Sequence, residues 1–424
     1  MSFEMRPITE LVDFNPKRAI KKGTVAPFID MAALPVLSRD VEEITEKEFK
    51  SGGAKFCNGD TLFARITPCL ENGKTAKVSG LERNQNGFGS TEFIVMSAKD
   101  REHDEDYVYY LARLPEFRAY AKARMEGTSG RQRVPWQSLA EFEYPMPSKE
   151  QRKRAGDFFR AIDNKISLNT KTNKTLEQMA QAIFKSWFVD FDPVKAKMNG
   201  EQPEGMDAAT ASLFPEKLVE SELGLIPEGW EVGDLSDLMD FNPKRTLKKG
   251  TIAPYLDMKN MPTSGHLALD IYDREMGSGT KFKNGDSLLA RITPCLENGK
   301  TAYVDFLKDE QVGWGSTEYI VMRSKSDSYK YFSYYMARFE PFRKFAIQSM
   351  TGTSGRQRAQ AQTVQTMPFA IPPISILEKF DAFIAPNMQM IKSHGSENRT
   401  LANLRDTLLP KLLSGEIKLE TNER

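Results

Sequence analysis

The chain has 424 residues with 59 basic and 58 acidic side chains, so its net charge of +1 provides no bulk-charge argument for a nucleic-acid partner. Hydrophobic and charged contents of 40% and 28% are those of an ordinary globular protein, and the length predicts two or three domains. Three cysteines without metal-site spacing, no leader-like start and no apolar run of roughly 20 residues predict a soluble cytoplasmic protein.

Much of the sequence occurs twice. Residues 56–76 and 282–302 differ at three positions, and further blocks return at offsets of 225 to 227 residues. These further pairs are residues 13–31 and 240–258, 87–96 and 313–322, and 127–133 and 352–358. A period of this size corresponds to a whole domain and not to a solenoid unit. The chain is therefore a tandem pair of domains, which suggests a partner with two matched halves.

The first copy opens with short segments separated by turn sequences. Residues 61–66, 75–78 and 92–96 are strand-like and are bounded by Asn-Gly and other glycine-containing turns, which is typical of β-hairpins. Residues 107–125 place apolar side chains near helical spacing and predict a helix. Each copy is therefore expected to fold as an α+β domain.

A proline-free, polar-rich stretch, residues 151–187, follows the first domain. Its candidate core positions step by three and four residues, which is the spacing of a heptad seam. These positions are Phe159, Ile162, Ile166, Asn169, Asn173, Leu176, Ala180, Ile183 and Trp187, and the second copy supplies Ile384, Asn387, Ile391, His394, Asn398, Leu401, Arg405, Leu408 and Leu412. A long helix cannot bury so narrow a stripe by itself, so the two helices are expected to pack on each other.

Both seams contain polar residues, and two interpretations stay open. Asparagine at a seam position weakens a helix pair but fixes its register; the same residues would also mark a partly solvated stretch. Pro386 lies inside the second helical stretch, where a proline removes a hydrogen bond, so this helix is expected to bend or restart there.

These patterns divide the chain into five segments. Residues 1–148 are predicted to form the first globular domain and 149–190 the first long helix, which acts as a spacer. An irregular connector rich in Pro, Gly and small polar residues occupies 191–228. Residues 229–374 are predicted to form the second domain, and 375–424 the second long helix with a C-terminal tail.

Catalytic motifs are missing from the sequence. It has no (Asp/Asn/Ser)-Pro-Pro-aromatic loop of an amino-methyltransferase and no GxxxxGK(S/T) phosphate loop for ATP hydrolysis. Its three histidines, His103, His266 and His394, are not equivalent between the copies, which excludes a repeated His-centred catalytic or metal site. We therefore expect no catalytic residue, metal or cofactor on this chain.

Basic and polar residues recur at matching places in both copies. The GTSGRQR loops, residues 127–133 and 352–358, combine glycines for close backbone approach with hydroxyl, Arg and Gln side chains that suit phosphate oxygens and base edges. The ARITPCLENGK blocks and NPKR turns add positive charge for a phosphate backbone. The candidate DNA-contacting residues are Arg131, Gln132, Arg133, Arg356, Gln357, Arg358, Arg65, Lys74, Arg291, Lys300, Lys17, Arg18, Lys244 and Arg245. The alternative is that these loops are ordinary turns with solvated charges.

Three aromatic residues, Phe184, Trp187 and Phe188, lie near the end of the first long helix. They are candidates for contact with another subunit. The alternative is that they fill the core where the helix meets a globular domain.

Several blocks together resemble the specificity subunit of type I restriction–modification systems. They are ITPCLENGK at residues 66–74 and 292–300, GFGSTEF and GWGSTEY at 87–93 and 313–319, the two GTSGRQR loops, KSWFVDFDP at 185–193, IPEGW at 226–230 and LRDTLLPKLLSGEIKL at 404–419. The resemblance covers essentially the whole chain in the family's order.

This resemblance implies a pseudo-two-fold symmetric α+β molecule. Two target-recognition domains, each reading half of a split DNA site, would be joined by two long helices packed as an antiparallel coiled coil. It implies double-stranded DNA, modification (methyltransferase) subunits and restriction (endonuclease and translocase) subunits as partners. S-adenosylmethionine for adenine methylation, ATP and Mg are expected on those partner subunits, and the chain itself is expected to be non-catalytic.

Because the two domains are close relatives, we expect similar, inverted half-sites. Any half-site difference is expected to originate in residues 32–55 and 259–281, where the copies diverge most, unless these are freely drifting surface loops. The competing hypothesis is a protein-interaction scaffold whose twin domains grip a dimeric protein without sequence-specific DNA binding. The missing motifs argue against a self-sufficient restriction–methylation enzyme.

Overall fold

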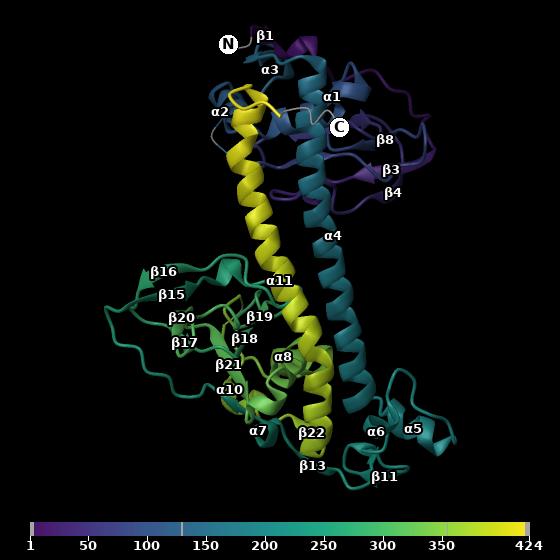
Figure 1. The fold of residues 1–424 in the computed structure, drawn as a ribbon, viewed down its shortest axis with the longest axis vertical. Coiled ribbons are helices and arrows are strands. Elements are labelled where there is room, and N and C mark those ends of the chain that lie inside the picture. Colours follow the sequence, from purple (N-terminus) through teal and green to yellow (C-terminus); the bar gives the residue numbers. More distant parts are fainter. Residues whose placement is uncertain (1–3, 129, 354, 420–424) are drawn as a thin grey trace. The chain divides into compact units, whose positions relative to one another are not determined.

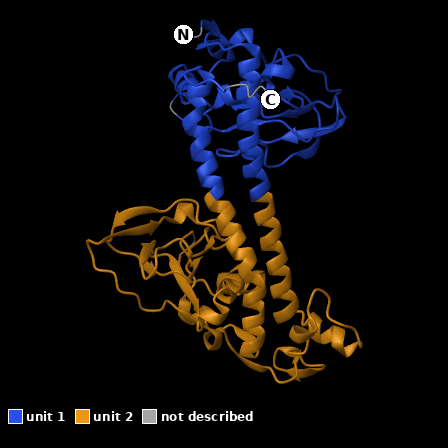
Figure 2. Cartoon of the chain, viewed as in Figure 1, with its two compact units in different colours: residues 1–169, 397–424 blue, residues 170–396 orange. Residues whose placement is uncertain are grey.

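The chain forms two compact units (Figure 2), described by a computed structural model over residues 4–128, 130–353 and 355–419. Unit 1 comprises Met1–Asn169 and Glu397–Arg424, and unit 2 comprises Thr170–Ser396. Each unit therefore combines the globular domain of one repeat with a segment of each long helix.

The domain of unit 1 alternates short strands and short helices (Figure 1). Its strands are β1 (Met5–Pro7), β2 (Val12–Phe14), β3 (Val25–Ile29), β4 (Thr45–Glu48), β5 (Ala54–Phe56), β6 (Thr61–Ala64), β7 (Thr75–Lys77), β8 (Gly87–Gly89), β9 (Phe93–Ala98) and β10 (Glu143–Pro145). Its helices are α1 (Arg101–Arg113), α2 (Pro115–Ala123) and α3 (Trp136–Ala140), with 3-10 turns η1 (Ile8–Glu10) and η2 (Met31–Ala33).

Two four-stranded sheets carry the domain of unit 1, with strand orders β2-β9-β6-β7 and β4-β3-β8-β5. The first sheet is antiparallel, whereas β3 and β8 of the second pair in parallel. All residues of β6 and β9 are buried, because these strands occupy the centre of their sheet and pack against α1. The strands predicted at residues 61–66, 75–78 and 92–96 are confirmed as β6, β7 and β9, with ends that differ by a few residues.

The domain of unit 2 repeats this order of elements. Its strands are β13 (Glu231–Asp234), β14 (Met239–Phe241), β15 (Ile252–Leu256), β16 (Tyr272–Glu275), β17 (Thr280–Phe282), β18 (Ser287–Ala290), β19 (Thr301–Tyr303), β20 (Gly313–Gly315), β21 (Tyr319–Ser324) and β22 (Pro368–Ile371). Its helical elements are α7 (Leu235–Leu238), η3 (Met258–Asn260), η4 (Asp327–Tyr329), α8 (Phe332–Arg338), α9 (Glu340–Gln348) and α10 (Ala361–Val364). The sheet orders β14-β21-β18-β19 and β16-β15-β20-β17 match those of unit 1 strand for strand. The α+β class and the tandem pair of domains are therefore confirmed.

The helix predicted over residues 107–125 is instead two helices, α1 and α2. Pro115 is the first residue of α2, where a missing backbone N–H costs nothing, and Leu114 before it is extended with φ −56° and ψ 135°. The apolar spacing continues across this corner, which is why the pattern alone did not show the break.

The segment at residues 191–228 is more ordered than its composition suggested. It contains α5 (Asp192–Met198), α6 (Ala208–Ala211) and a hairpin of β11 (Leu218–Ser221) with β12 (Gly224–Pro227). Phe191, Val194, Phe214 and Ile226 are buried in the core of unit 2. Hydrophobic anchors spaced through a Pro- and Gly-rich stretch therefore fix a segment that was expected to be an irregular connector.

Two helices of matching extent, α4 (Lys149–Phe188) and α11 (Ile374–Leu413), contribute to both units. Every seam position named above is buried or partly buried. Within unit 1, Asn169 Nδ2 donates to Asn398 Oδ1 at 2.9 Å; within unit 2, Asn173 Oδ1 lies 2.8 Å from His394 Nδ1. A later residue of α4 therefore pairs with an earlier residue of α11, so the helix segments pack antiparallel. The polar seam residues bond across the pair, which favours the register-fixing interpretation over the solvated one.

Helix α11 runs continuously through Pro386, so the predicted restart there was wrong. Pro386 is exposed, and so is Ala382, the residue whose carbonyl loses its helical donor. Water can satisfy that carbonyl, which makes the proline tolerable at this position. Within the described residues, none of the helices has the combination of length and apolar content needed to cross a bilayer.

Candidate nucleic-acid interface

The GTSGRQR segment of unit 1 folds into a tight loop. Glu126 and Arg133 pair across its base, and the Arg131 N–H donates to the Thr128 carbonyl at 3.0 Å. Gly127 has a φ of 118°, in the region that favours glycine, and a Cβ there would lie 3.1 Å from the Arg131 carbonyl oxygen. The glycine therefore serves the backbone of a closed loop.

Unit 2 builds the same loop from its own copy. Thr351 and Arg358 pair across the base, the Arg356 N–H donates to the Thr353 carbonyl at 3.0 Å, and Gly352 has a φ of 127°. The serine hydroxyls predicted to suit phosphate belong to Ser129 and Ser354, which lie outside the described residues. The two copies thus agree in backbone geometry as well as in sequence.

A backbone ladder joins each loop to the ITPCLENGK block. In unit 1, Thr67 donates its N–H to the Gln132 carbonyl and Val134 donates to the Arg65 carbonyl, both at 3.0 Å. In unit 2 the corresponding bonds run from Thr293 to Gln357 at 3.1 Å and from Ala359 to Arg291 at 2.8 Å. Two sequence blocks that were proposed separately therefore form one surface element in each unit.

The last arginine of each loop is held by a carboxylate. Arg133 donates from Nε and Nη2 to Glu92 at distances between 2.7 and 2.9 Å. Arg358 makes the same paired contact with Glu318 at 2.8 to 2.9 Å. Two parallel bonds to one carboxylate fix the plane of each guanidinium. These arginines therefore brace their loops against the residues that immediately precede strands β9 and β21.

The NPKR turn of unit 1 is anchored at both ends. Asn15, with a φ of 47°, donates its N–H to the Val95 carbonyl at 2.7 Å and accepts the Val95 N–H on Oδ1 at 2.9 Å. Arg18 Nη2 donates to Asp60 at 2.8 Å. Burial raises the pKa of the Asp60 carboxyl, while the Cys57 N–H and the Arg18 guanidinium oppose that rise. Asp60 is thus a buried counter-ion and turn anchor.

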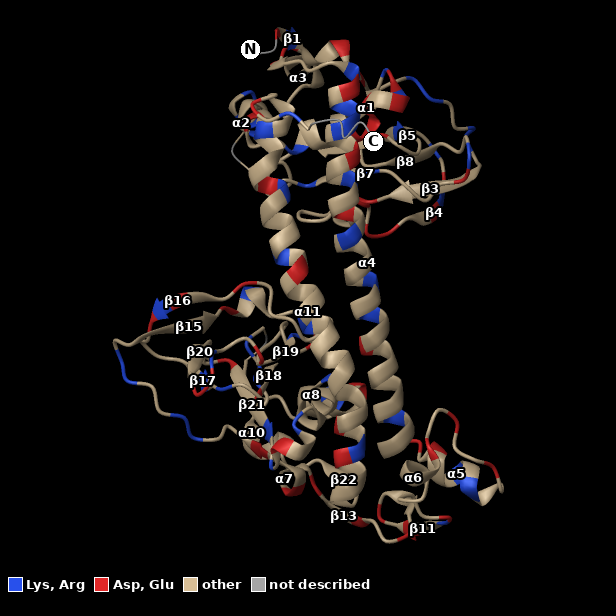
Figure 3. Ribbon diagram, in the orientation of Figure 1, with Lys and Arg blue, Asp and Glu red and all other residues tan. Residues whose placement is uncertain are grey.

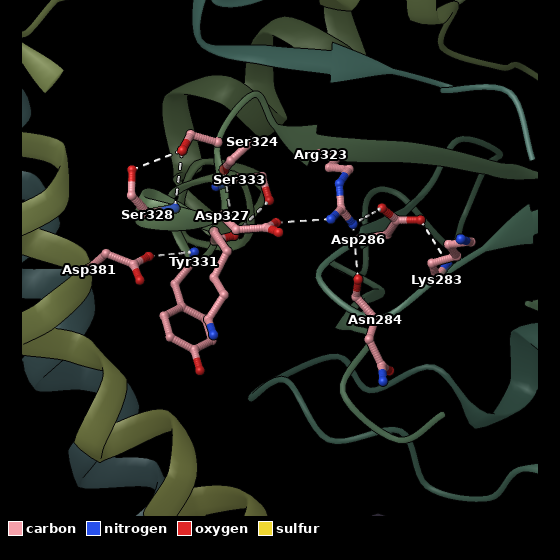
Figure 4. Close-up of polar contacts among 12 residues, drawn as sticks. Lys283, Asn284, Asp286, Arg323, Ser324, Asp327, Ser328, Tyr331, Ser333 and Asp381 are labelled. Carbon is pink, nitrogen blue, oxygen red and sulfur yellow. Dashed lines mark hydrogen bonds and ion pairs between the residues drawn. The ribbon is translucent and has the colours of Figure 1, made fainter. Parts of the chain in front are cut away.

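The same anchor in unit 2 holds its second arginine more closely than in unit 1, where Arg101 lies 4.0 Å from Asp60. Arg245 donates to Asp286 at 2.9 Å, and Asp286 also accepts from Arg323 at 3.0 Å and from the Lys283 N–H at 2.8 Å. Figure 4 shows Asp286 between Arg323 and Lys283, with the carbonyl of Asn284 as a second acceptor for the arginine. The fully buried carboxylate therefore organises the basic turn from the inside.

The lysines of the ITPCLENGK blocks also have internal acceptors. Lys74 Nζ donates to the Met31 carbonyl at 2.9 Å, and Lys300 Nζ donates to the Met258 carbonyl at 2.7 Å. Each lysine therefore ties its block to a 3-10 turn. This turn is η2, which follows β3, in unit 1 and η3, which follows β15, in unit 2.

These contacts narrow the predicted set of DNA-contacting residues. Three pairs have internal partners that account for their presence in both copies: Arg133 and Arg358, Arg18 and Arg245, and Lys74 and Lys300. These contacts favour a role for the three pairs in positioning the loops. The other candidates are the exposed Arg131 with Arg356 and Lys17 with Lys244, and the partly buried Gln132 with Gln357 and Arg65 with Arg291; of these, Arg291 Nε also lies 3.6 Å from Glu318.

An open cleft of about 600 Å³ in unit 1 lies beside these candidates. Lys17, Arg18, Lys55 and Arg65 line it, and the described lining residues include no acidic side chain. Arg65 Nε is buried without a hydrogen-bond acceptor in the described part of the chain. Figure 3 shows the corresponding basic turn of unit 2 as blue stretches on the long loop that leads into β15. Positive charge with unfilled donors suits a polyanion.

The aromatic residues at the end of α4 are core residues. Phe184, Trp187 and Phe188 are 2%, 7% and 1% exposed and belong to the core of unit 2. Their rings lie 5.2 to 6.0 Å from the ring of Phe380. Their burial favours the alternative, that these rings fill the core where the helix meets the domain, and the subunit contact stays a prediction.

Comparison with known proteins identifies the family. Residues 2–178 and 227–394 match the family described as type I restriction modification DNA specificity domain, so the chain belongs to this family. It is 26% identical over 404 residues to the HindI specificity subunit of Haemophilus influenzae, covering 85% of this chain and 86% of the relative. It is also 26% identical over 405 residues to the MjaIX specificity subunit of Methanocaldococcus jannaschii, covering 91% and 84%.

A solved structure has the same fold. The S subunit of a type I restriction–modification system from M. genitalium superposes with a TM-score of 0.55 at 14% identity, covering 97% of this chain and 96% of that one.

Proposed function

We propose that this chain is the DNA-reading, non-catalytic specificity subunit of a type I restriction–modification complex, with each domain reading one half of a bipartite site. The observation that carries the proposal is the same loop built twice, with Arg131 and Arg356 exposed at corresponding positions. Family membership over both domains supports it. Phosphate contacts would set the register on the duplex, and base contacts would give specificity.

The other activities of such a complex belong to partner subunits. Modification subunits would supply S-adenosylmethionine-dependent adenine methylation, and restriction subunits would supply ATP- and Mg-dependent cleavage.

We further propose that the two half-sites are similar and inverted. The loop at residues 127–133 and its copy at 352–358 have identical sequences, and their supports from Glu92 and Glu318 are the same. Half-sites read by identical loops on equivalent supports should share bases. A difference between the half-sites would originate in residues 32–55 and 259–281, where the copies differ most.

Single-molecule methylome sequencing tests the proposal in cells that carry this subunit with its modification subunit. We expect one methylated-adenine motif with two short, related halves and a fixed gap. Two unrelated half-sites would reject the symmetry proposal and keep the DNA-reading role. Absence of any motif, with both subunits expressed and associated, would favour the alternative of a protein-interaction scaffold. Steep loss of DNA affinity with salt separates these functions, since a scaffold has no such dependence.

A further inference from the structure

A charged cluster is buried between the long helices inside unit 1. Asp163 of α4 and Arg405 of α11 form an ion pair at 2.7 Å, with side chains 4% and 5% exposed. Asp163 also accepts the Tyr110 hydroxyl at 2.7 Å, and Arg405 Nε also donates to the exposed Asp406 at 2.8 Å. An ion pair at this depth needs its partner, because an unpaired buried charge is strongly unfavourable.

Unit 2 has an apolar cluster at the equivalent position. Helices α4 and α11 correspond at an offset of 225 residues, so Met388 is the counterpart of Asp163 and Ala180 that of Arg405. Met388 and Ala180 are 2% and 0% exposed. Tyr335, the counterpart of Tyr110, directs its hydroxyl to the Met388 sulfur at 3.2 Å. The geometry is thus retained while the chemistry changes from charged to neutral.

The difference has consequences for which helices can pair. Within each unit, a segment of repeat 1 packs on a segment of repeat 2. If repeat 1 instead paired with repeat 1 of a second copy, Asp163 would face Ala180 and lose Arg405. If repeat 2 paired with repeat 2, Arg405 would face Met388. Both like-with-like assemblies therefore leave the charge at position 163 or 405 buried without its partner, whereas the pairing of unlike repeats pairs these two charges with each other.

We propose that the Asp163–Arg405 pair makes the long helix of each repeat pack on the long helix of the other repeat. The same pair disfavours packing on the identical helix of a second copy of the chain. This is a pairing rule for the helix surface, independent of DNA reading. It acts by excluding the wrong partner and needs no net gain in stability from the ion pair itself.

Such a rule matters during synthesis. Repeat 1 is complete before repeat 2 exists, and at about 5–20 residues per second the second helix follows the first by roughly 10–45 s. During that interval α4 lacks its partner on the same chain, and an identical helix on another nascent chain is available to it. Asp163 disfavours that partner until Arg405 arrives.

The test uses full-length chains and substitutions that the other repeat already carries. Asp163→Met leaves Arg405 without its partner, and Arg405→Ala leaves Asp163 without its partner. Alone, each variant should lose folded yield and unfold at lower denaturant. Co-expressed with different tags, the two chains can exchange helices. One shared unit then holds the Asp163–Arg405 pair, and the other places the introduced methionine against the introduced alanine, so no buried charge is unpaired.

The expected size of the effect favours a detectable mixed dimer. A buried charge that has lost its partner should lower the folding equilibrium constant on the order of 10²-fold. We use the low end of the expected range because Arg39 also interacts electrostatically with Asp163. Two such penalties, relieved together, give on the order of 10⁴-fold against an intrachain effective concentration of about 1 mM. The mixed dimer should form at micromolar concentration or below, seen as a 1:1 species by tandem-tag purification and native mass spectrometry.

Two controls make the result decisive. The double variant D163M/R405A in one chain has no buried charge to pair, so it should fold as well as the unchanged chain. The pair Lys165 and Glu397, at 3.4 Å and nearly half exposed, is the matched cross-helix control. K165M and E397A should fold alone and form no mixed dimer. The proposal is overturned if the single variants at 163 and 405 keep full stability, or if the double variant folds while the co-expressed singles give no mixed dimer.

Discussion

Replacing Arg131 with alanine is the sharpest test of the DNA interface, because this side chain is exposed and its backbone already holds the loop. The Arg131 N–H bond to the Thr128 carbonyl survives truncation of the side chain, so the loop should keep its shape. If the guanidinium reads a base edge, the loss should be about 1–3 kcal/mol, or roughly 5- to 150-fold in Kd. If it contacts only a phosphate, affinity should fall similarly on all sequences and the salt slope should drop by about 1.

The repeat adds a quantitative constraint. Arg356 occupies the same position on the same loop geometry in unit 2, so R356A should cost the same as R131A to within about 0.5 kcal/mol. The two loops belong to different compact units and share no partner, so the double variant should lose the sum, about 2–6 kcal/mol. A large inequality would show that the two half-sites are read differently.

The assay is fluorescence anisotropy on the methylome-derived duplex, with the full chain bound to its modification subunit and salt varied. Lys153→Ala on α4 is a charge-matched control at a side chain that is 43% exposed and paired with Asp157. If R131A binds DNA as tightly and as selectively as the control at every salt concentration, the loop is structural and the hypothesis that this surface contacts DNA is refuted.

Three further outcomes are expected. Glu92→Gln should loosen the loop by weakening its arginine brace, so the loop becomes protease-sensitive and DNA binding falls, although a carboxylate would not itself bind a phosphate. Lys17→Ala and Lys244→Ala should each lower the salt slope by about 1 and leave base preference unchanged, as measured on matched and mismatched duplexes. Burial raises the pKa of Asp381 from 3.8 to about 6, although it accepts the Tyr331 N–H at 2.7 Å (Figure 4). A raised folded-state pKa contributes stability that is present below about 3.8 and lost as pH rises through about 6. Asp381→Asn should therefore gain about 2 kcal/mol over the unchanged chain between pH 4 and pH 7, read from urea midpoints; parallel pH profiles would contradict this.

The repeat and the strands of each domain could be predicted from the sequence because their signals are local. Alternation between Asn-Gly turns locates β6 and β7 to within a few residues, and the seam spacing locates α4 and α11. The corner before α2 could not be placed, since apolar spacing runs through it and only Pro115 marks it. The ordered structure of residues 191–228 was missed because their few hydrophobic anchors are separated by many turn-forming residues.

The set of predicted DNA-contacting residues includes several with internal partners, and there is a physical reason why the sequence could not distinguish them. The retention of a basic residue in both copies is explained equally well by contact with DNA and by an ion pair with an internal carboxylate. The acceptor for Arg133 is 41 residues away in sequence and the acceptor for Arg18 is 42 residues away. No local sequence pattern reveals such distant partners. The presence of a basic residue in both copies therefore does not distinguish a DNA-contacting residue from one that supports a loop. Only the fold divides the fourteen candidates into those that hold a loop and those that extend from it.

The two repeats are alike on one surface and unlike on another, and the contrast follows what each surface contacts. The loops that would meet DNA are identical, as expected if similar half-sites are read by both domains. The helix faces that meet each other have diverged into a charged site around Asp163 and a neutral one around Met388. In a duplicated chain with identical helix faces, only the effective concentration within one chain would favour pairing across its own repeats over pairing with a second copy. The different residues at this buried position disfavour pairing between like helices of two copies, and they leave the surface that would read DNA unchanged.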